Sequence, residues 1–370
     1  MVVCVVFDIL IEKEEETMNI ANQTKWASRA QEAFNSLLQN YWNHHLNMFN
    51  NHYPNPDNRP NITFHYWWYA HAIDSLVDAY NRTNDEEMTS LIEKEYNGLL
   101  FRNGGQPTNL LYDDMEWLAL ALLRAYQATS NETYLKDVHI LWDDIKTGWN
   151  DQMGGGIAWH KEQLGYKNTP ANAPAIILAA RLYKEFGNEA DLKFAKELFT
   201  WLDDHLVDKE TGFVMDGINR LGDGQIDTDW EFTYCQGVYV GGAVELYRIT
   251  NDNQYLEKAL KTAHFAIEKL HNKTHNVLKS EGNGDGGLFK GIMIRYFTEL
   301  IATAPERTEA ILTYLKMNAE TLWQHGTNTD KMIFNHLWSE QPDLPEGIDL
   351  SIQLSGVFLF ECLASLERSK

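Results

Sequence analysis

The chain repeats one helical unit, and this repeat limits the folds open to it. Four apolar stretches each end in a tyrosine and a short polar turn, namely Tyr80 before NRTND, Tyr126 before QATSNET, Tyr183 before KEFGNEADL and Tyr247 before RITNDNQ. Successive tyrosines are 46, 57 and 64 residues apart, which leaves room for two helices and a variable loop. Apolar residues recur at three-and-four spacing in these stretches, as in amphipathic helices. The repeating unit is therefore a helical hairpin.

About twelve helices are expected between Thr24 and Ser369, with no strand-like alternation of any length. Six such hairpins predict an all-α protein, an (α/α)6 barrel in which inner helices line a funnel and outer helices surround them. An open solenoid is the alternative fold. The loops before the presumed inner helices, such as DQMGGGIAWHKEQLGYKNTPAN, are rich in Gly, Asn, Asp and Trp. One face of the barrel is therefore expected to gather the functional residues.

No linker or change of composition divides the chain after Met18. We therefore expect a single domain over residues 18–370, preceded by an N-terminal appendage outside the core over residues 1–17. The segment MVVCVVFDIL has no basic residues before it, and no uninterrupted apolar run reaches about 18 residues, the length that a membrane-spanning helix needs. These features predict no signal peptide, no membrane association and a cytoplasmic location.

The acidic composition restricts the partners. The 31 Lys and Arg residues against 53 Asp and Glu residues give a formal net charge of −22. Such a charge repels a phosphate backbone, so no nucleic acid is expected as a partner. Cys4, Cys235 and Cys362 are far apart, which supports neither a disulfide framework nor a zinc cluster. The chain has 12 Trp, 17 Tyr and 16 Phe, and either a cleft for neutral carbohydrate or a large core would use them.

The sharpest motif is YDDMEWLALALL, in which two adjacent carboxyl groups, Asp113 and Asp114, open a strongly apolar helix. Helix capping explains one aspartate at such a position, but not the second. Glycoside hydrolysis needs two carboxyl groups, one to donate a proton and the other to act as nucleophile or base. Cα atoms of neighbouring residues lie about 3.8 Å apart. This short separation favours the close carboxyl spacing of a retaining site over the wider spacing of an inverting one.

Two other aspartate pairs serve as internal controls. Asp143-Asp144 and Asp203-Asp204 fall in predicted outer helices. The amphipathic pattern of those helices favours a solvated face for both pairs.

Several segments, taken in order, resemble glycoside hydrolase family 76: YDDMEWLALALLRAYQAT, GWNDQMGGGIAWHKE, KNTPANAPAIILAARLY, TGFVMDGIN, FTYCQGVYVGGAVELYR and FKGIMIRYF. The resemblance runs from about Trp26 to the last helix and is to endo-α-1,6-mannanases. It implies an (α/α)6 barrel and retaining hydrolysis of α-1,6-mannan or α-1,6-linked manno-oligosaccharide. It also implies Asp113 as nucleophile, Asp114 as acid/base, and no metal or other cofactor. The chain departs from the family pattern at Cys235, where asparagine is expected, and at the MEW that follows the pair.

Further substrate-binding candidates come from the loops before the inner helices. Aromatic candidates, which either stack on mannose rings or pack in the core, are Trp67, Trp68 and Trp117. Candidates at one helix entry, where capping competes with hydroxyl recognition, are Lys167, Asn168 and Asn172. Candidates at the following entries are Asp216, Asp227, Asp229, Tyr234, Gln236 and Asp285. We expect the polar side chains of this set to bind sugar hydroxyl groups.

Two other functions are compatible with parts of the sequence. A sugar epimerase or isomerase with this fold would use histidines as acid and base, and His65, His71 and His160 lie near the predicted mouth. A non-catalytic glycan-binding barrel would not need the aspartate pair. The acidic run that begins at Asp223 lacks the spacing of an EF-hand, so no metal site is predicted. We expect a monomer.

Overall fold

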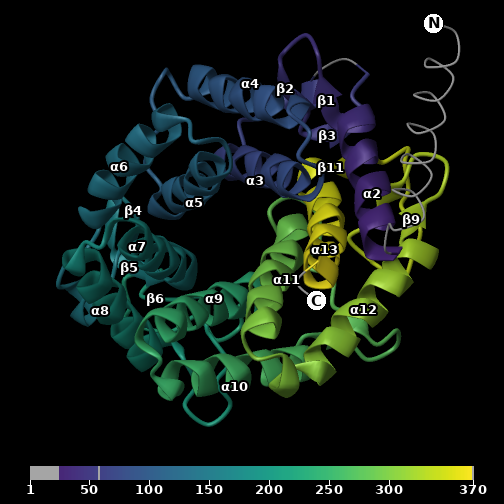
Figure 1. The fold of residues 1–370 in the computed structure, drawn as a ribbon. Helices are drawn as coiled ribbons and strands as arrows, with labels where there is room; N and C mark the ends of the chain where they lie inside the picture. Colours follow the sequence, from purple (N-terminus) through teal and green to yellow (C-terminus); the bar gives the residue numbers. More distant parts are fainter. Residues whose placement is uncertain (1–24, 57–58, 369–370) are drawn as a thin grey trace, which may run out of the picture.

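Helices form two concentric rings in the part of the chain that the structure describes (Figure 1). The computed structural model describes residues 25–56 and 59–368. The inner ring consists of α3 (Tyr66–Thr83), α5 (Tyr112–Thr129), α7 (Ala173–Phe186), α9 (Thr233–Thr250), α11 (Gly286–Thr303) and α13 (Leu350–Arg368). The outer ring consists of α2 (Lys25–Tyr41), α4 (Glu87–Arg102), α6 (Glu132–Lys146), α8 (Glu189–Leu206), α10 (Asn253–Lys269) and α12 (Glu309–Gln324). The predicted (α/α)6 barrel is confirmed, whereas the appendage expected over residues 1–17 lies outside the described residues.

Each inner helix packs against an outer helix, and neighbouring hairpins close into a ring. The helix α3 packs against α4, and the same pairing joins α5 to α6, α7 to α8, α9 to α10 and α11 to α12. The last inner helix, α13, packs against the first outer helix, α2, so the two ends of the described chain complete one hairpin. Because α13 also contacts both α11 and α3, the barrel is closed. The open solenoid is therefore excluded.

The repeated tyrosines mark one type of turn between an inner and an outer helix. After each tyrosine-containing helix, a residue with positive φ donates its backbone N–H to the tyrosine carbonyl oxygen; these donors are Asn84, Ser130, Gly187 and Asn251. At three of the turns the next side chain, that of Asn131, Asn188 or Asp252, caps the outer helix. The polar turn thus ends one helix and starts the next, which is the physical basis of the sequence repeat.

Short strands occur in the loops between the helices. The strands are β1 (Trp42–Asn43), β2 (Met48–Phe49), β3 (His52–Tyr53), β4 (Ala158–His160), β5 (Gln163–Asn168), β6 (Gly217–Ile218), β7 (His271–Asn272), β8 (Val277–Leu278), β9 (Thr327–Asn328), β10 (Ile333–Phe334) and β11 (Ile348–Asp349). Antiparallel pairing joins β4, β5 and β6 into one sheet, with Lys167 opposite both Ala158 and Ile218. Each of these strands is too short for its alternation to stand out in the sequence. The sheet connects the loop before α7 to the loop before α9.

The inner helices are buried on nearly all sides, and glycine allows two of them to approach closely. A Cβ atom at Gly237 of α9 would lie 2.5 Å from the Cα atom of Met293 on α11, so no larger residue fits there. In the described part of the chain, α13 has the length and apolar composition of a membrane-spanning helix, and 83% of that segment is buried within the barrel.

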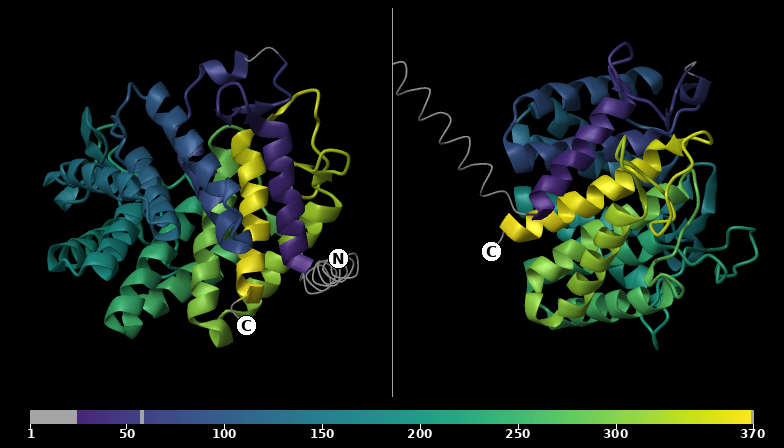
Figure 2. Two further views of the ribbon diagram at one scale, coloured as in Figure 1. Left: turned by 45° about the horizontal axis from the view of Figure 1, so that its top comes forward. Right: turned by 90° about the vertical axis from the view of Figure 1, so that its right-hand side faces the viewer.

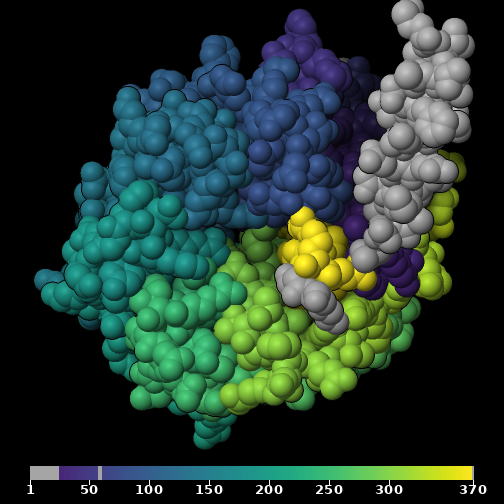
Figure 3. Space-filling view, in the orientation of Figure 1, coloured from purple at the N-terminus to yellow at the C-terminus, as the bar shows by residue number. Residues whose placement is uncertain are grey.

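The two ends of the barrel differ. The C-terminal ends of the inner helices face the viewer in Figures 1 and 3 and form what we call the base. Charged side chains from α3, α5, α7, α11 and α13 line a cavity of about 230 Å³ there, visible as a hollow beside the yellow end of α13 in Figure 3. The N-terminal ends of the inner helices, with the loops before them, form the mouth at the opposite end (Figure 2).

Candidate active site

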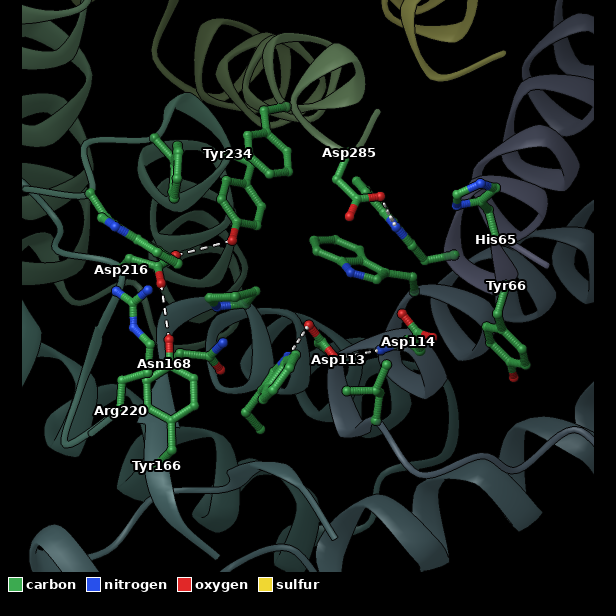
Figure 4. A pocket seen from close by; sticks show the side chains of 18 of the residues that line it. His65, Tyr66, Asp113, Asp114, Tyr166, Asn168, Asp216, Arg220, Tyr234 and Asp285 are labelled. Atoms are coloured by element: carbon green, nitrogen blue, oxygen red, sulfur yellow. Dashed lines mark hydrogen bonds between the residues drawn. The ribbon is translucent and has the colours of Figure 1, made fainter. Parts of the chain in front are cut away.

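A cleft of about 440 Å³ opens at the mouth of the barrel (Figure 4). Its walls come from the N-terminal ends of α3, α5 and α11, the sheet that contains β4 and β5, and the segment between β6 and α9. The lining residues are Phe64, His65, Tyr66, Trp67, Leu111, Asp113, Asp114, Trp117, Trp159, Tyr166, Asn168, Pro170, Asp216, Arg220, Trp230, Phe232, Tyr234, Asp285 and Phe289. Aromatic rings and aspartates dominate this lining, a combination suited to a neutral sugar.

Asp113 and Asp114 occupy the first turn of α5. The backbone N–H of Asp114 donates to Oδ1 of Asp113 over 3.0 Å, and the indole N–H of Trp159 donates to Oδ2 of Asp113 over 3.1 Å. The side-chain amide of Asn109 donates to Oδ2 of Asp114 over 2.9 Å. Neutral donors thus hold both carboxyl groups in place within the cleft.

Burial raises the pKa of both carboxyl groups. Asp114 is only 8% exposed, and burial raises its pKa to about 7; the hydrogen bond from Asn109 opposes this rise and the charge of Asp285 adds to it. The pKa of Asp113 lies well above its usual value because of burial and the charge of Asp114, although the Asp114 amide and the Trp159 indole oppose the rise. Two such groups do not both ionise readily near neutral pH, so the pair retains one proton.

Asp216 forms a second polar centre in the cleft. Its Oδ2 accepts a hydrogen bond from the hydroxyl of Tyr166, and its Oδ1 accepts one from the hydroxyl of Tyr234, both over 3.1 Å. The thiol of Cys235, which replaces the asparagine expected from the family motif, lies 3.6 Å from Oδ1 of Asp216. The ring of Tyr234 stacks on Phe289 with 4.0 Å between ring centres. The Asp216 network therefore fixes two of the tyrosines that line the cleft.

Asp285 connects α3 to α11 across the mouth. Its Oδ1 accepts hydrogen bonds from the indole N–H groups of Trp67 and Trp68, each over 2.9 Å. The ring of His65 stacks on Trp68 with 3.7 Å between ring centres. Trp68 is 2% exposed and does not line the cleft. It therefore supports His65 and Asp285, which do.

The structure brings together eight of the residues singled out from the sequence: Trp67, Asp113, Asp114, Trp117, Asn168, Asp216, Tyr234 and Asp285. The other candidates do not line the cleft: Trp68, Lys167, Asn172, Asp227, Asp229 and Gln236. All eight lie near the start of an inner helix, either in its first turns or in the strand or loop that leads into it.

Three of the residues outside the cleft bind main-chain atoms instead. The ammonium group of Lys167 donates to the carbonyl oxygen of Gly156 over 2.7 Å. The amide of Asn172 bonds both the N–H and the carbonyl oxygen of Ile157, and Gln236 makes the same paired contact with the segment before β6. All three side chains are buried. The expectation that they contact sugar is corrected, because burial and main-chain partners leave them to hold the loops in place.

Asp227 and Asp229 belong to the segment between β6 and α9. Asp227 forms an ion pair with Arg220, with 2.8 Å between Oδ1 and Nη2. Asp229 is exposed. Neither carboxylate therefore lines the cleft, although Asp227 holds Arg220, which does.

Sequence reasoning missed part of the lining: Phe64, Tyr66, Leu111, Trp159, Tyr166, Pro170, Arg220, Trp230, Phe232 and Phe289. Most of them lie in the same loops as the residues that were singled out, so the aromatic content of those loops is the signal that would have found them. Predicting Trp159 and Tyr166 would also have required recognition of the β4–β5 hairpin, because pairing of these strands brings both side chains to the cleft.

The histidines do not form an acid–base pair in the cleft. Of the three near the mouth, only His65 lines it. His71 is buried against Trp117, and burial lowers its pKa to about 3. In the described part of the chain, no group of three or more His, Cys, Asp or Glu side chains is placed to hold a metal ion.

The two control pairs differ from each other. Asp143-Asp144 lies on the outer helix α6 with Asp143 exposed, as expected. Asp203 is buried, and its carboxylate accepts hydrogen bonds from the hydroxyl of Tyr239 and the ammonium of Lys258, both over 2.6 Å. The expectation of a solvated face is therefore wrong for Asp203, because the adjacent helices α9 and α10 supply partners that helical periodicity alone does not reveal.

Comparisons with known proteins give the family of the chain. The model of glycosyl hydrolase family 76 matches residues 25–361. The Lin0763 protein of Listeria innocua is 41% identical, with 94% of this chain and 99% of that chain covered and a TM-score of 0.88. The GH76A α-1,6-mannanase of Salegentibacter sp. HEL1_6 is 38% identical, with 92% and 100% covered and a TM-score of 0.86. An inactive variant of that enzyme, in which two consecutive aspartates are replaced by alanine, was solved with α-1,6-mannotetrose.

A curated relative is more distant. Mannan endo-1,6-alpha-mannosidase DFG5 of Candida albicans is 26% identical over 283 residues. The match covers 69% of this chain and 62% of that relative, so the chain matches less than two thirds of the relative's length. The family match spans nearly all of the residues that the structure describes, and on this evidence the chain belongs to glycosyl hydrolase family 76.

Proposed function

We propose that this protein hydrolyses α-1,6-mannosidic bonds within mannan or manno-oligosaccharides. The observation that carries the proposal is the adjacent pair Asp113-Asp114 inside an aromatic cleft, where partial or full burial raises the pKa of both carboxyl groups. The relatives support the substrate, since they include an α-1,6-mannanase and a mannan endo-1,6-alpha-mannosidase. The inactive relative lacks two consecutive aspartates, which supports the role of an adjacent pair.

The reaction that we propose retains the anomeric configuration. The Asp113 carboxylate attacks the anomeric carbon, and the Asp114 carboxyl group donates its proton to the departing glycosidic oxygen. The resulting glycosyl-enzyme is hydrolysed by water, from which the Asp114 carboxylate removes a proton. Asp113 is then released as a carboxylate and Asp114 regains its proton.

Hydrogen bonding supports this division of roles. Burial disfavours charge on either carboxyl group, but Asp113 accepts two hydrogen bonds, from the Trp159 indole and the Asp114 amide. Asp114 accepts one, from Asn109, and the nearby charge of Asp285 further disfavours its ionisation. Donors stabilise the charged form of a carboxyl group. The charge of Asp114 also raises the pKa of Asp113, so the pair shares one proton. We propose that this proton lies on Asp114, and the negative charge on Asp113, when the reaction begins.

The remaining lining supports a neutral glycan as the ligand. Trp67, Trp117 and the stacked pair of Tyr234 and Phe289 present apolar ring faces to the C–H faces of pyranose rings. Asn168 and Asp285 bring polar groups into the same cleft for sugar hydroxyls.

The roles are tested by removing each carboxyl group and changing the leaving group. Asp113→Ala removes the nucleophile, so cleavage of α-1,6-mannotetraose and of an activated aryl α-1,6-mannobioside should both fall by several orders of magnitude. Asp114→Ala should lose most activity on the tetraose but retain much of the first step on the aryl substrate, whose leaving group needs no proton. Added azide should then yield an α-configured mannosyl azide. Equal loss on both substrates in Asp114→Ala contradicts the assignment, and epimer formation without new reducing ends would indicate an isomerase instead.

A further inference from the structure

The segment between β6 and α9 projects from the mouth of the barrel and exposes large apolar side chains. In the right-hand view of Figure 2 it is the teal loop on the side away from the C-terminus. Leu221 is 85% exposed, Trp230 43% and Ile226 39%. Large apolar side chains are usually buried, so their exposure on one segment beside a cleft points to a ligand.

This segment has defined internal structure. The backbone N–H of Asn219 donates to the carbonyl oxygen of Gln225 over 2.8 Å, and Ile218 pairs with Ile226. The side-chain amide of Gln163, on β5, donates to the carbonyl oxygen of Arg220 over 3.0 Å. The segment therefore extends the sheet of β4, β5 and β6 and is anchored to a wall of the cleft.

The indole of Trp230 is held by contacts that leave it exposed. The guanidinium of Arg220 lies directly over the Trp230 ring. Asp227 fixes this guanidinium through two contacts, one from Nε to Oδ2 at 3.1 Å and one from Nη2 to Oδ1 at 2.8 Å. Phe232 contacts the indole edge-on, with 5.7 Å between ring centres. The indole is thus oriented on one side by a paired guanidinium while 43% of the residue faces solvent.

Arg220 and Trp230 both line the cleft that contains the aspartate pair. In Figure 4 the pair lies between Arg220 on one side and His65 and Tyr66 on the other. A glycan that crosses the cleft and passes Asp113 would therefore reach the projecting segment on the Arg220 side.

We propose that Trp230, oriented by Arg220 and Asp227, is a stacking platform for a mannose residue of the glycan that lies away from the bond being cleaved. This inference rests on the proposed function and adds a preference for long α-1,6-linked chains. A pre-oriented ring binds sugar with little loss of conformational freedom, so the ion pair contributes through the position of the indole. Arg220 is a positioning residue in this arrangement.

The platform is tested by the ratio of kcat/KM for α-1,6-mannan to kcat/KM for α-1,6-mannotriose. Trp230→Ala should lower this ratio about tenfold, which is about 1.4 kcal/mol, because one stacked ring is lost. Trp230→Phe should restore most of the ratio because it keeps an aromatic face. Arg220→Ala should give an intermediate ratio, because the indole remains but is no longer oriented.

Trp323→Ala is the matched control, because this tryptophan on α12 also carries an arginine, Arg29, over its ring but does not line the cleft. It should leave the ratio unchanged. An unchanged ratio in Trp230→Ala overturns the platform while leaving the hydrolase proposal intact. Absence of new reducing ends from the native protein overturns the hydrolase proposal. In that case the platform is tested separately by calorimetric measurement of α-1,6-mannan binding. Trp230→Ala should weaken this binding about tenfold. Equal binding by the native protein and the variant overturns the platform.

Discussion

Carboxyl groups are buried at both ends of the barrel, but their partners differ. At the base, the carboxylate of Asp78 pairs with Arg124 and with Arg295, the latter over 2.6 Å. Asp74 pairs with the same two arginines. At the mouth, the hydrogen bonds to Asp113 come from an indole and a backbone N–H.

The difference in partners determines whether the pKa of a carboxyl group falls or rises. Burial disfavours the charge of Asp78, but the charges of Arg124 and Arg295 outweigh it and lower its pKa to about 2. Burial of Asp114 is opposed only by the Asn109 hydrogen bond, so its pKa rises to about 7. The Asp78 carboxylate on α3 therefore remains ionised and binds α5 and α11 through Arg124 and Arg295. Carboxyl groups at the mouth can exchange a proton near neutral pH, which suits acid–base chemistry.

The largest effect is expected at the mouth, on activity. Asp113→Asn should lower kcat/KM on α-1,6-mannan by about 10⁴-fold or more, because no nucleophile remains. Asp143→Asn, on the exposed face of α6, should lose less than about tenfold because that side chain makes no contact with the cleft. Initial rates of reducing-end release measure both. A fully active Asp113→Asn, or an inactive Asp143→Asn, would contradict the assignment of the pair.

The next effect is expected at the base, on stability. Asp78→Asn leaves the partly buried guanidinium groups of Arg124 and Arg295 with Asp74 as their shared partner, so the free energy of unfolding should fall by about 3 kcal/mol. Urea denaturation followed by circular dichroism measures the change. Asp113→Asn should not reduce stability in the same assay, because it removes a carboxyl group that burial disfavours. The comparison of the two ends fails if these two variants lose the same stability.

The smallest effect is a change in the pH dependence of stability. The folded-state pKa of Asp114 is raised from its ordinary value to about 7. As pH rises from about 4 to about 7, the unfolded chain releases this proton and the folded protein keeps it, so this group lowers stability with rising pH. Asp114→Asn should therefore lose less stability than the native protein between pH 4.5 and 7.5, by an amount of the order of 2 kcal/mol. Parallel pH profiles for the two proteins would show that Asp114 ionises in the cleft as it does in water.

The sequence revealed those features of the molecule that depend on local pattern. Helical periodicity and the tyrosine-containing turns predicted the barrel, because capping and amphipathicity act within a few residues. The pair Asp113-Asp114 was visible because both carboxyl groups are adjacent in the chain. Lys167 and Asn172 were misassigned because their main-chain partners, Gly156 and Ile157, become neighbours only through strand pairing.

Other features depend on contacts that no local pattern reports. Trp230 reaches the cleft because its segment extends a sheet whose strands are only two to six residues long. The ion pairs at the base of the barrel join arginines and carboxylates from α3, α5 and α11, and these helices are far apart in the chain. Asp203 was expected to be solvated because its partner Lys258 lies on another helix.

The stereochemistry of the first product tests the central claim most directly. Native protein is incubated with α-1,6-mannotetraose, and proton NMR spectra are recorded before the new reducing end mutarotates. A nucleophilic Asp113 with Asp114 as acid/base predicts that the α-anomer appears first and the β-anomer accumulates only by mutarotation. Early appearance of the β-anomer would show inversion and would contradict the covalent mechanism at this pair.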